Sequence, residues 1–160
     1  MSATTLQAKV DEFLAQKRIA VVGVSRDNER HPVANLIYHR LRALGREVLA
    51  VNPNMPVYEG EPCYPDLKSI PGGADGAVIV TRPETTEQIV RDCDEAGVRR
   101  VWMHRGMGSG SSVSPRAVEY CRQHDFSVIA GACPMMYGEG VDFGHKCMRW
   151  MLGLTGGLPA

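Results

Sequence analysis

The sequence predicts an α/β fold, namely a three-layer, Rossmann-like, doubly wound parallel sheet of about five strands with flanking helices. Two observations predict it. Short apolar runs rich in β-branched residues recur along the chain, as is typical of central parallel strands that are covered on both faces. Between these runs, apolar residues recur at helical spacing. General rules for crossovers in such folds give the expected strand order 3-2-1-4-5, with strands numbered along the chain.

The individual elements follow from the same pattern. Prolines favour the first turn of a helix, and helices are therefore expected to begin at Pro32, Pro83 and Pro115. Gly45 is expected to end the first of these helices. Two further helices are expected at residues 4–17 and 143–152. The predicted strands lie at residues 19–24, 47–51, 76–81, 100–104 and 126–131.

The remaining segments and the chain length indicate how many domains to expect. Residues 53–75 contain Gly72, Gly73 and several prolines, which predicts mainly a long connection. Residues 132–160 suffice for a loop and one helix. The length of 160 residues suits one domain with a substantial core, so a single domain over residues 1–160 is expected.

Composition excludes several classes of partner. The net charge is zero and the pI is about 7.0, so no nucleic-acid partner is expected. The longest apolar runs fall far short of the roughly 20 residues of a membrane span, and the N-terminus lacks a secretory signal pattern. A cytoplasmic location without a membrane partner is therefore expected. The five cysteines form no C-x-x-C pair and the histidines are scattered, so reduced thiols and no metal site are predicted.

The candidate binding residues follow the predicted strands, because ligands of open parallel sheets bind outside the carboxyl ends of the strands. Gly23 allows close backbone approach, Ser25 offers a hydroxyl, and the next helix presents its positive end. Arg26 and Arg30 can add charge-assisted bonds to phosphate oxygens. We therefore predict a phosphate-binding loop, with an ordinary strand–helix turn and solvated arginines as the alternative.

NAD is the alternative ligand, but two features count against it. A dinucleotide loop usually reads G-x-G-x-x-G, whereas Ser25 and Asn28 occupy the second and third glycine positions. The second strand ends in Asn52 and Pro53, where a dinucleotide enzyme usually carries an acid that binds the ribose. A ligand with several phosphates is favoured instead.

An ordered set of motifs carries a family resemblance. The segments are IAVVGVSRDNERHPVANLIYHRLRALGREVLAVNP, then AVIVTRP, RVWMHRGM and a late CP. In this order they resemble the small bacterial CoA-binding protein family, whose fold is similar to the CoA-binding domain of the succinyl-CoA synthetase α subunit. The resemblance covers about residues 5–140. It implies a nucleotide-binding protein whose ligand is coenzyme A or an acyl-CoA.

The resemblance also implies roles for individual residues. In that family the first loop takes the CoA phosphates, the VNP turn lies near the adenosine, and the turn after the third strand contacts the ligand. Arg26 or Arg30 is expected to meet the 3′-phosphate of CoA, and the sequence does not choose between them. The fourth-strand turn is a less direct candidate. By position, the implied binding residues are Gly23, Val24, Ser25, Arg26, Asn52, Pro53, Val80, Thr81, Arg82, Pro83, Met103, His104 and Gly106.

The sequence favours a binding module over an enzyme, because no nucleophile, base and acid form a complete catalytic set. Cys133 is a candidate thiol near the ligand, with a structural cysteine as the alternative. The resemblance implies that a synthetase needs a second domain with a phosphorylatable histidine, and no such length follows residue 131. A carrier, a sensor or a subunit is expected, with an NAD-binding domain or a small acyl-CoA-handling enzyme or component of a split synthetase as alternatives.

A homo-oligomer or a partner enzyme subunit is compatible with this function. Trp102 and Trp150 are candidates for a dimer surface if they are exposed. Their positions in a predicted strand and a predicted helix favour core packing for both.

Overall fold

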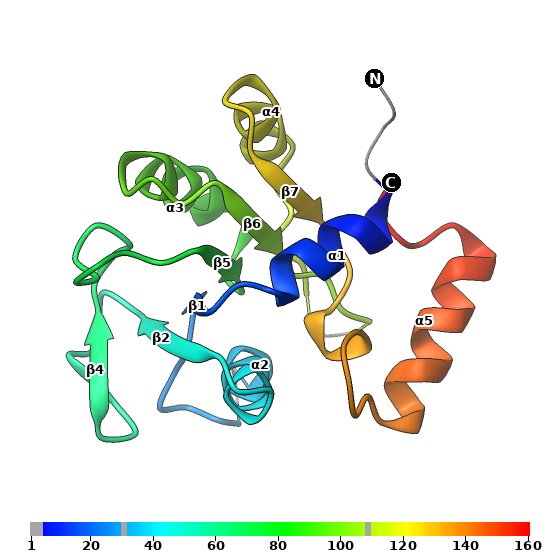
Figure 1. Cartoon of the computed structure of the whole chain (residues 1–160), viewed down its shortest axis with the longest axis horizontal. Helices are drawn as coiled ribbons and strands as arrows, with labels where there is room; N and C mark the ends of the chain where they lie inside the picture. Colours follow the sequence, from blue (N-terminus) through cyan, green and yellow to red (C-terminus); the bar gives the residue numbers. More distant parts are fainter. Residues whose placement is uncertain (1–4, 30–31, 108–109) are drawn as a thin grey trace.

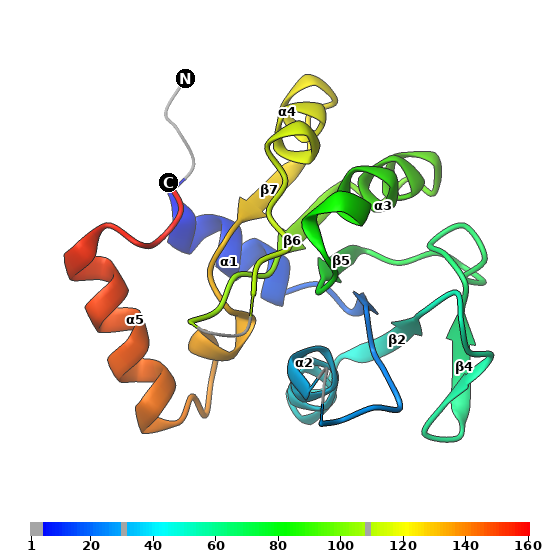
Figure 2. The same cartoon turned by 180° about the vertical axis from the view of Figure 1, so that it is seen from behind.

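The computed structural model confirms the predicted fold class. A mostly parallel, seven-stranded sheet lies between two layers of helices (Figures 1 and 2). The structure describes residues 5–29, 32–107 and 110–160, without the side chain of Pro32. The helices are α1 (Leu6–Leu14), α2 (Pro32–Ala43), α3 (Pro83–Glu95), α4 (Pro115–Gln123), the 3-10 helix η1 (Pro134–Met136) and α5 (Phe143–Thr155). The strands are β1 (Arg18–Val22), β2 (Glu47–Val51), β3 (Val57–Tyr58), β4 (Glu61–Tyr64), β5 (Gly76–Ile79), β6 (Arg100–Met103) and β7 (Ser127–Ala130).

The two faces of the sheet have separate cores. Helices α1 and α2 and the 3-10 helix η1 pack on one face, and α3 and α4 pack on the other. Central strand β1 supplies both cores: Ile19 and Val21 point to the first, and Ala20 and Val22 to the second. Burial on both faces explains why this strand is a continuous apolar run instead of an alternating one.

The strand order is β3-β4-β2-β1-β5-β6-β7, and it corrects two predictions. Residues 53–75 are more than a connection, because they supply β3 and β4, which form an antiparallel hairpin. The strand predicted at residues 76–81 does not lie beside the second strand: β5 pairs with β1, and β4 takes the third place, parallel to β2. The sheet therefore has more strands than predicted, while its doubly wound order is retained.

The hairpin escaped prediction because β4 carries a weak strand signal. It contains Pro62, and its first two residues are exposed. Its pairing with β2 covers only Ala50 with Cys63 and Val51 with Tyr64. Short edge strands that contain proline are typical of sheet borders, and they lack the apolar run that marks a central strand.

The two tryptophans have opposite environments. Trp102 is fully buried, and its indole N–H donates to the carbonyl oxygens of Gly131 at 3.1 Å and Ala132 at 3.3 Å. Trp150 is 67% exposed on α5, so the prediction of core packing is confirmed for Trp102 and wrong for Trp150. Within the described ranges, no helix is both long and apolar enough to cross a membrane.

Candidate functional site

The first loop, residues 23–29, lies where the strand order reverses. Strand β1 has β2 on one side and β5 on the other, and both are parallel to it. The backbone N–H of Gly23 donates to Val51 at 3.0 Å, and the N–H of Val80 donates to Val22 at 2.9 Å. The loop therefore begins between the ends of its two neighbouring strands, at the switch point where ligands of such folds bind.

Gly23 is needed for a contact within the protein. Its φ is +112°, in a region that favours glycine, and a Cβ at this position would lie 2.1 Å from the carbonyl oxygen of Val80. The same Cβ would lie 3.4 Å from Cγ2 of Thr81. The glycine thus allows the first loop and the turn after β5 to meet, which brings two predicted site segments together.

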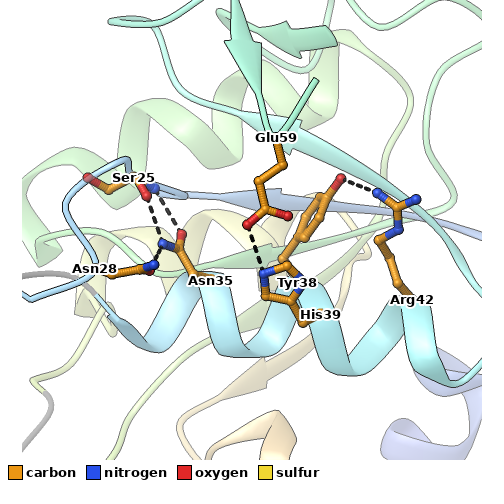
Figure 3. Close-up of polar contacts among 7 residues, drawn as sticks. All are labelled: Ser25, Asn28, Asn35, Tyr38, His39, Arg42 and Glu59. Carbon is orange, nitrogen blue, oxygen red and sulfur yellow. Dashed lines mark hydrogen bonds and ion pairs between the residues drawn. The ribbon is translucent and has the colours of Figure 1, made fainter. Parts of the chain in front are cut away.

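An asparagine on α2 determines the shape of the first loop (Figure 3). Asn35 is 3% exposed, and its Oδ1 accepts the backbone N–H of Ser25 at 3.0 Å. Its Nδ2 donates to the carbonyl of Ser25 at 2.7 Å and to Oδ1 of Asn28. Asn35 is not among the residues predicted from the sequence. The sequence offered no signal for it, because Asn35 lies two positions before Ile37 and therefore off the apolar stripe formed by Ile37 and Leu41.

Asn52 ties the loop to the end of β2. Its Nδ2 donates to the carbonyl of Val24 at 2.8 Å, and its Oδ1 accepts the N–H of Asn54 at 2.8 Å. Pro53 is exposed beside it, whereas Val24 is fully buried. The VNP turn therefore lies against the first loop, and the Asn52 side chain holds that loop through the carbonyl of Val24.

Ser25 and Arg26 are the described loop residues with polar groups suited to phosphate. The hydroxyl oxygen of Ser25 accepts the N–H of Asp27 at 3.1 Å, and the hydroxyl proton remains available for donation. Arg26 is exposed, and its guanidinium donates weakly to the carbonyl of Val57 at 3.4 Å. Glu29 also lies in this loop, and its N–H donates to the Asp27 carboxylate at 3.2 Å. Arg30 lies outside the described residues.

A buried serine joins the turns after β5 and β6. Ser112 is 1% exposed, and its hydroxyl oxygen accepts the N–H of Thr81 at 3.0 Å. Its carbonyl accepts the hydroxyl of Thr86 at 2.7 Å, and its N–H donates to the carbonyl of His104 at 2.8 Å. Ser112 is not among the residues predicted from the sequence. Arg82 is exposed on this edge, where it precedes Pro83 at the start of α3.

The fourth-strand turn is mostly below the surface. Met103 is fully buried, and His104 is 1% exposed with no hydrogen-bond partner for Nε2 within the described part of the chain. Burial lowers the pKa of His104 to about 4, so its imidazole is neutral at pH 7. Gly106 is half-buried and donates to Gly110 at 3.1 Å. Gly106 is therefore better exposed for direct contact with a ligand than Met103 is.

Acidification is expected to destabilise the protein through His104. The pKa of His104 is about 4 in the folded chain against the ordinary 6.5, so the unfolded chain binds more protons between these values. The stability linked to this group is present above pH 6.5 and is lost as the pH falls toward 4, by about 2 kcal/mol on reaching about pH 5. Urea unfolding at about pH 7.5 and about pH 5 measures the loss. The matched His104→Gln chain should show a shallower pH dependence, and equal slopes would contradict the assignment.

Cys133 follows β7 at the same edge of the sheet. It is 6% exposed and precedes η1. Burial raises the pKa of its thiol, which keeps it protonated and a poor nucleophile at pH 7. Its proximity to a ligand stays a prediction, whereas its burial favours the alternative of a structural cysteine.

The structure thus brings the predicted turns to one edge of the sheet. The first loop contacts the turns after β2 and β5, Ser112 links the turn after β5 to that after β6, and the N–H of Arg105 donates to Ala132 beyond β7 at 3.1 Å. Their contacts with a ligand stay a prediction.

The comparison with known families decides what kind of domain this is. The model of the CoA binding domain family matches residues 17–139. The chain belongs to the CoA-binding domain family. The matched range runs from β1 to the loop before α5, and therefore includes all the strand-end turns described above. The resemblance seen in the sequence motifs is confirmed.

Relatives of this CoA-binding domain include a ligase and a ligase subunit, and both are longer than this chain. Acetate–CoA ligase (ADP-forming) I of Archaeoglobus fulgidus is 35% identical over 89 residues, which is 56% of this chain and 13% of the ligase. The α subunit of acetate–CoA ligase (ADP-forming) II of Pyrococcus furiosus is 28% identical over 130 residues, which is 78% of this chain and 28% of the subunit. The chain therefore spans less than a third of either relative.

A solved structure shows the same architecture. A hypothetical protein from Pyrococcus horikoshii OT3 has a TM-score of 0.73 and 26% identity, over 84% of this chain and 94% of that one. The likeness to this solved structure therefore agrees with the three-layer fold of the chain and with its family membership.

Proposed function

We propose that this chain binds coenzyme A or an acyl-CoA at the carboxyl edge of its sheet. The observation that carries the proposal is the family match over residues 17–139. The matched range includes the first loop, which is hydrogen-bonded to Asn35 and Asn52 at the switch point. Preformed loops of this kind bind phosphates with little loss of conformational entropy on binding. The family match gives no support to NAD as the alternative ligand.

Within this site, the CoA phosphates are proposed to lie against the first loop. Arg26 is the exposed cation of the described loop, and the Ser25 hydroxyl can donate a further hydrogen bond. The adenosine is proposed to lie near Asn52 and Pro53, and the rest of the ligand to pass the turn at Thr81 and its neighbours. These roles follow from the family motif and from the adjacency of the turns.

We further propose that the chain works as a carrier, a sensor or a subunit, as one single-domain unit without catalysis of its own. Burial of Cys133 and His104 supports this proposal, since it keeps the thiol protonated and both side chains away from the surface. The Pyrococcus furiosus relative is a ligase subunit by name, which supports the proposal that this chain works as a subunit.

Thermal unfolding in the presence of different ligands tests the proposal. Coenzyme A at one hundred times its dissociation constant should stabilise the native state by about 2.7 kcal/mol and raise Tm by roughly 5–10 °C. Acetyl-CoA should act similarly, whereas ADP and NAD at the same concentration should act less. A rise in Tm with NAD and none with CoA would refute the proposed ligand.

A matched pair of variants locates the site. Arg26→Gln should reduce the Tm shift produced by CoA and should narrow the difference between CoA and 3′-dephospho-CoA, because that difference reports a contact with the 3′-phosphate. Arg122→Gln, on the exposed surface of α4, serves as the control for loss of one positive charge. Sustained release of free thiol from acetyl-CoA would contradict the proposal of a binding module.

A further inference from the structure

A groove separates helix α5 from the segment that precedes it. It has a volume of about 550 Å³, which is within the range of small-molecule sites in proteins. One wall comes from α5, which lies at the border of the molecule in both views, and the other from residues 136–141 (Figures 1 and 2). The residues that line the groove are different from those predicted to bind CoA at the carboxyl edge of the sheet. The groove is therefore a second candidate site.

The groove has a charged end and an apolar end. Lys146 and Arg149 line it in the first half of α5, and Trp150, Leu154 and Leu158 line it further along the chain. Lys146 and Leu154 are eight residues apart, which is about 12 Å along the helix axis. None of the described residues that line the groove is acidic. An elongated ligand with an anion at one end and an apolar tail at the other matches this order of side chains.

The two cations of the groove have no acidic partner within the described part of the chain. The guanidinium of Arg149 donates to the neutral side chain of Gln7 at 2.8 Å and lies 4.6 Å from the ring centre of Tyr137. These contacts hold the guanidinium in place without compensating its charge. Asp142, the first acid before α5, is occupied at the helix start, where it accepts the N–H of His145 at 3.1 Å. The positive charge at this end of the groove therefore favours an anion.

The wall opposite α5 is fixed by an arginine from a distant part of the chain. The guanidinium of Arg40, on α2, donates to the carbonyl oxygens of Tyr137 at 3.2 Å, Glu139 at 2.6 Å and Gly140 at 3.3 Å. Three hydrogen bonds from one side chain hold this segment in a single shape. A groove with a preformed wall loses little conformational entropy when it binds a ligand.

A glycine keeps the apolar end of the groove open. Gly153 lies between Trp150 and Leu154, which are 67% and 69% exposed, and all three line the groove. Glycine in a helix interior is destabilising relative to alanine. Packing does not require a glycine here, because an added Cβ would lie at an ordinary 3.9 Å from Cδ1 of Leu158. The missing side chain instead leaves space beside two exposed apolar residues.

We propose that this groove binds a free fatty acid of medium chain length. The carboxylate lies at Lys146 and Arg149, where both cations can donate charge-assisted hydrogen bonds. The tail runs past Gly153 toward Leu158 and covers apolar surface of Trp150 and Leu154 that otherwise faces water. This site is additional to the proposed CoA site and does not depend on it.

Titration with decanoate, below its micelle concentration and followed by tryptophan fluorescence, tests the proposal. The emission of the exposed Trp150 should shift to shorter wavelength as the tail covers it, while the fully buried Trp102 gives a constant background. Trp150→Phe should therefore lose the shift. Decyltrimethylammonium, which has the same tail and a positive head, should bind at least about tenfold more weakly than decanoate. Equal affinities for the two compounds, or no binding of decanoate, would overturn the proposal.

Two variants locate the fatty acid in the groove. Lys146→Glu should weaken decanoate binding at least about tenfold, because it reverses an exposed charge that has no acidic partner in the described chain. Arg122→Glu, on the exposed surface of α4, is the matched control and should bind decanoate as the wild-type chain does. Gly153→Phe should abolish binding by filling the groove, with circular dichroism and Tm showing that it is folded. Wild-type affinity in a folded Gly153→Phe chain would contradict this location.

Two further measurements separate the groove from other places where an amphipathic anion could bind. CoA, at a concentration that saturates its own Tm shift, should leave the decanoate dissociation constant unchanged. Competition between the two would place decanoate at the carboxyl edge of the sheet and would overturn the proposed site. Sedimentation of the chain with phosphatidylcholine–phosphatidylglycerol vesicles, without binding of free decanoate, would show that α5 binds a lipid surface and not a free fatty acid.

Discussion

Replacement of Gly23 by alanine is expected to lower the free energy of unfolding by about 3 kcal/mol or more. The added Cβ would lie 2.1 Å from the carbonyl oxygen of Val80 and 2.9 Å from its carbonyl carbon. Both atoms belong to backbone that is hydrogen-bonded to β1, so neither can move without disturbing the centre of the sheet. The φ of +112° adds strain for any residue with a side chain.

Urea unfolding followed by circular dichroism measures this loss. Gly45→Ala is the matched control, because Gly45 also has a positive φ, of +79°, but has no atom within 4 Å of its Cβ position. The control should lose only the roughly 1–2 kcal/mol of a left-handed alanine. Equal losses in the two variants would show that close approach to Val80 is not what requires a glycine at residue 23.

Replacement of Asn35 by alanine is expected to lower affinity for CoA at least about tenfold, with a loss of roughly 1–3 kcal/mol in the free energy of unfolding. The change removes the acceptor for the N–H of Ser25 and the donor to its carbonyl, at 3.0 and 2.7 Å. Part-buried backbone groups would then lack partners, and the first loop would relax away from its bound shape. Affinity falls because loop ordering must then accompany binding.

Isothermal titration with CoA measures the affinity, and urea unfolding measures the stability. Gln123→Ala is a suitable control, since this exposed amide on α4 donates to the Glu119 carboxylate at 2.9 Å, one turn earlier on the same helix. Asn35→Asp should also weaken binding, because the carboxylate retains the acceptor but loses the donor. Unchanged CoA affinity in a folded Asn35→Ala chain would show that the fixed loop shape is not needed for binding.

The Gly23→Ala and Asn35→Ala variants both test what fixes the shape of the first loop. Some residues whose types suggest a ligand-binding loop in the sequence are also required for contacts within the protein itself. Gly23 allows the carbonyl of Val80 to approach closely, and the side-chain amide of Asn52 donates to the carbonyl of Val24. The proposed site is therefore built from residues that first shape the loop, while Arg26 and the Ser25 hydroxyl are the described groups that remain to face phosphate.

Much of the fold could be predicted from local pattern. The apolar runs of β1, β2, β5, β6 and β7 are long enough to identify buried strands, and the prolines at the starts of α3 and α4 mark those helices. Parallel strands that alternate with helices place all the strand-end turns at one edge. The ordered motifs in those turns were enough to indicate the CoA-binding family, which the match over residues 17–139 confirms.

By itself, the sequence determined the fold class, the edge of the sheet at which the predicted binding residues gather, and the family, because these depend on periodicity and short motifs along the chain. Tertiary structure alone decided that β4 takes the third place in the sheet, that Asn35 holds the first loop, and that Trp102 is buried while Trp150 is exposed. The physical reason is that each of these outcomes depends on partners from other elements. An apolar residue at helical spacing shows that a face will be covered, but whether this chain or another covers it depends on which surfaces meet when the chain folds.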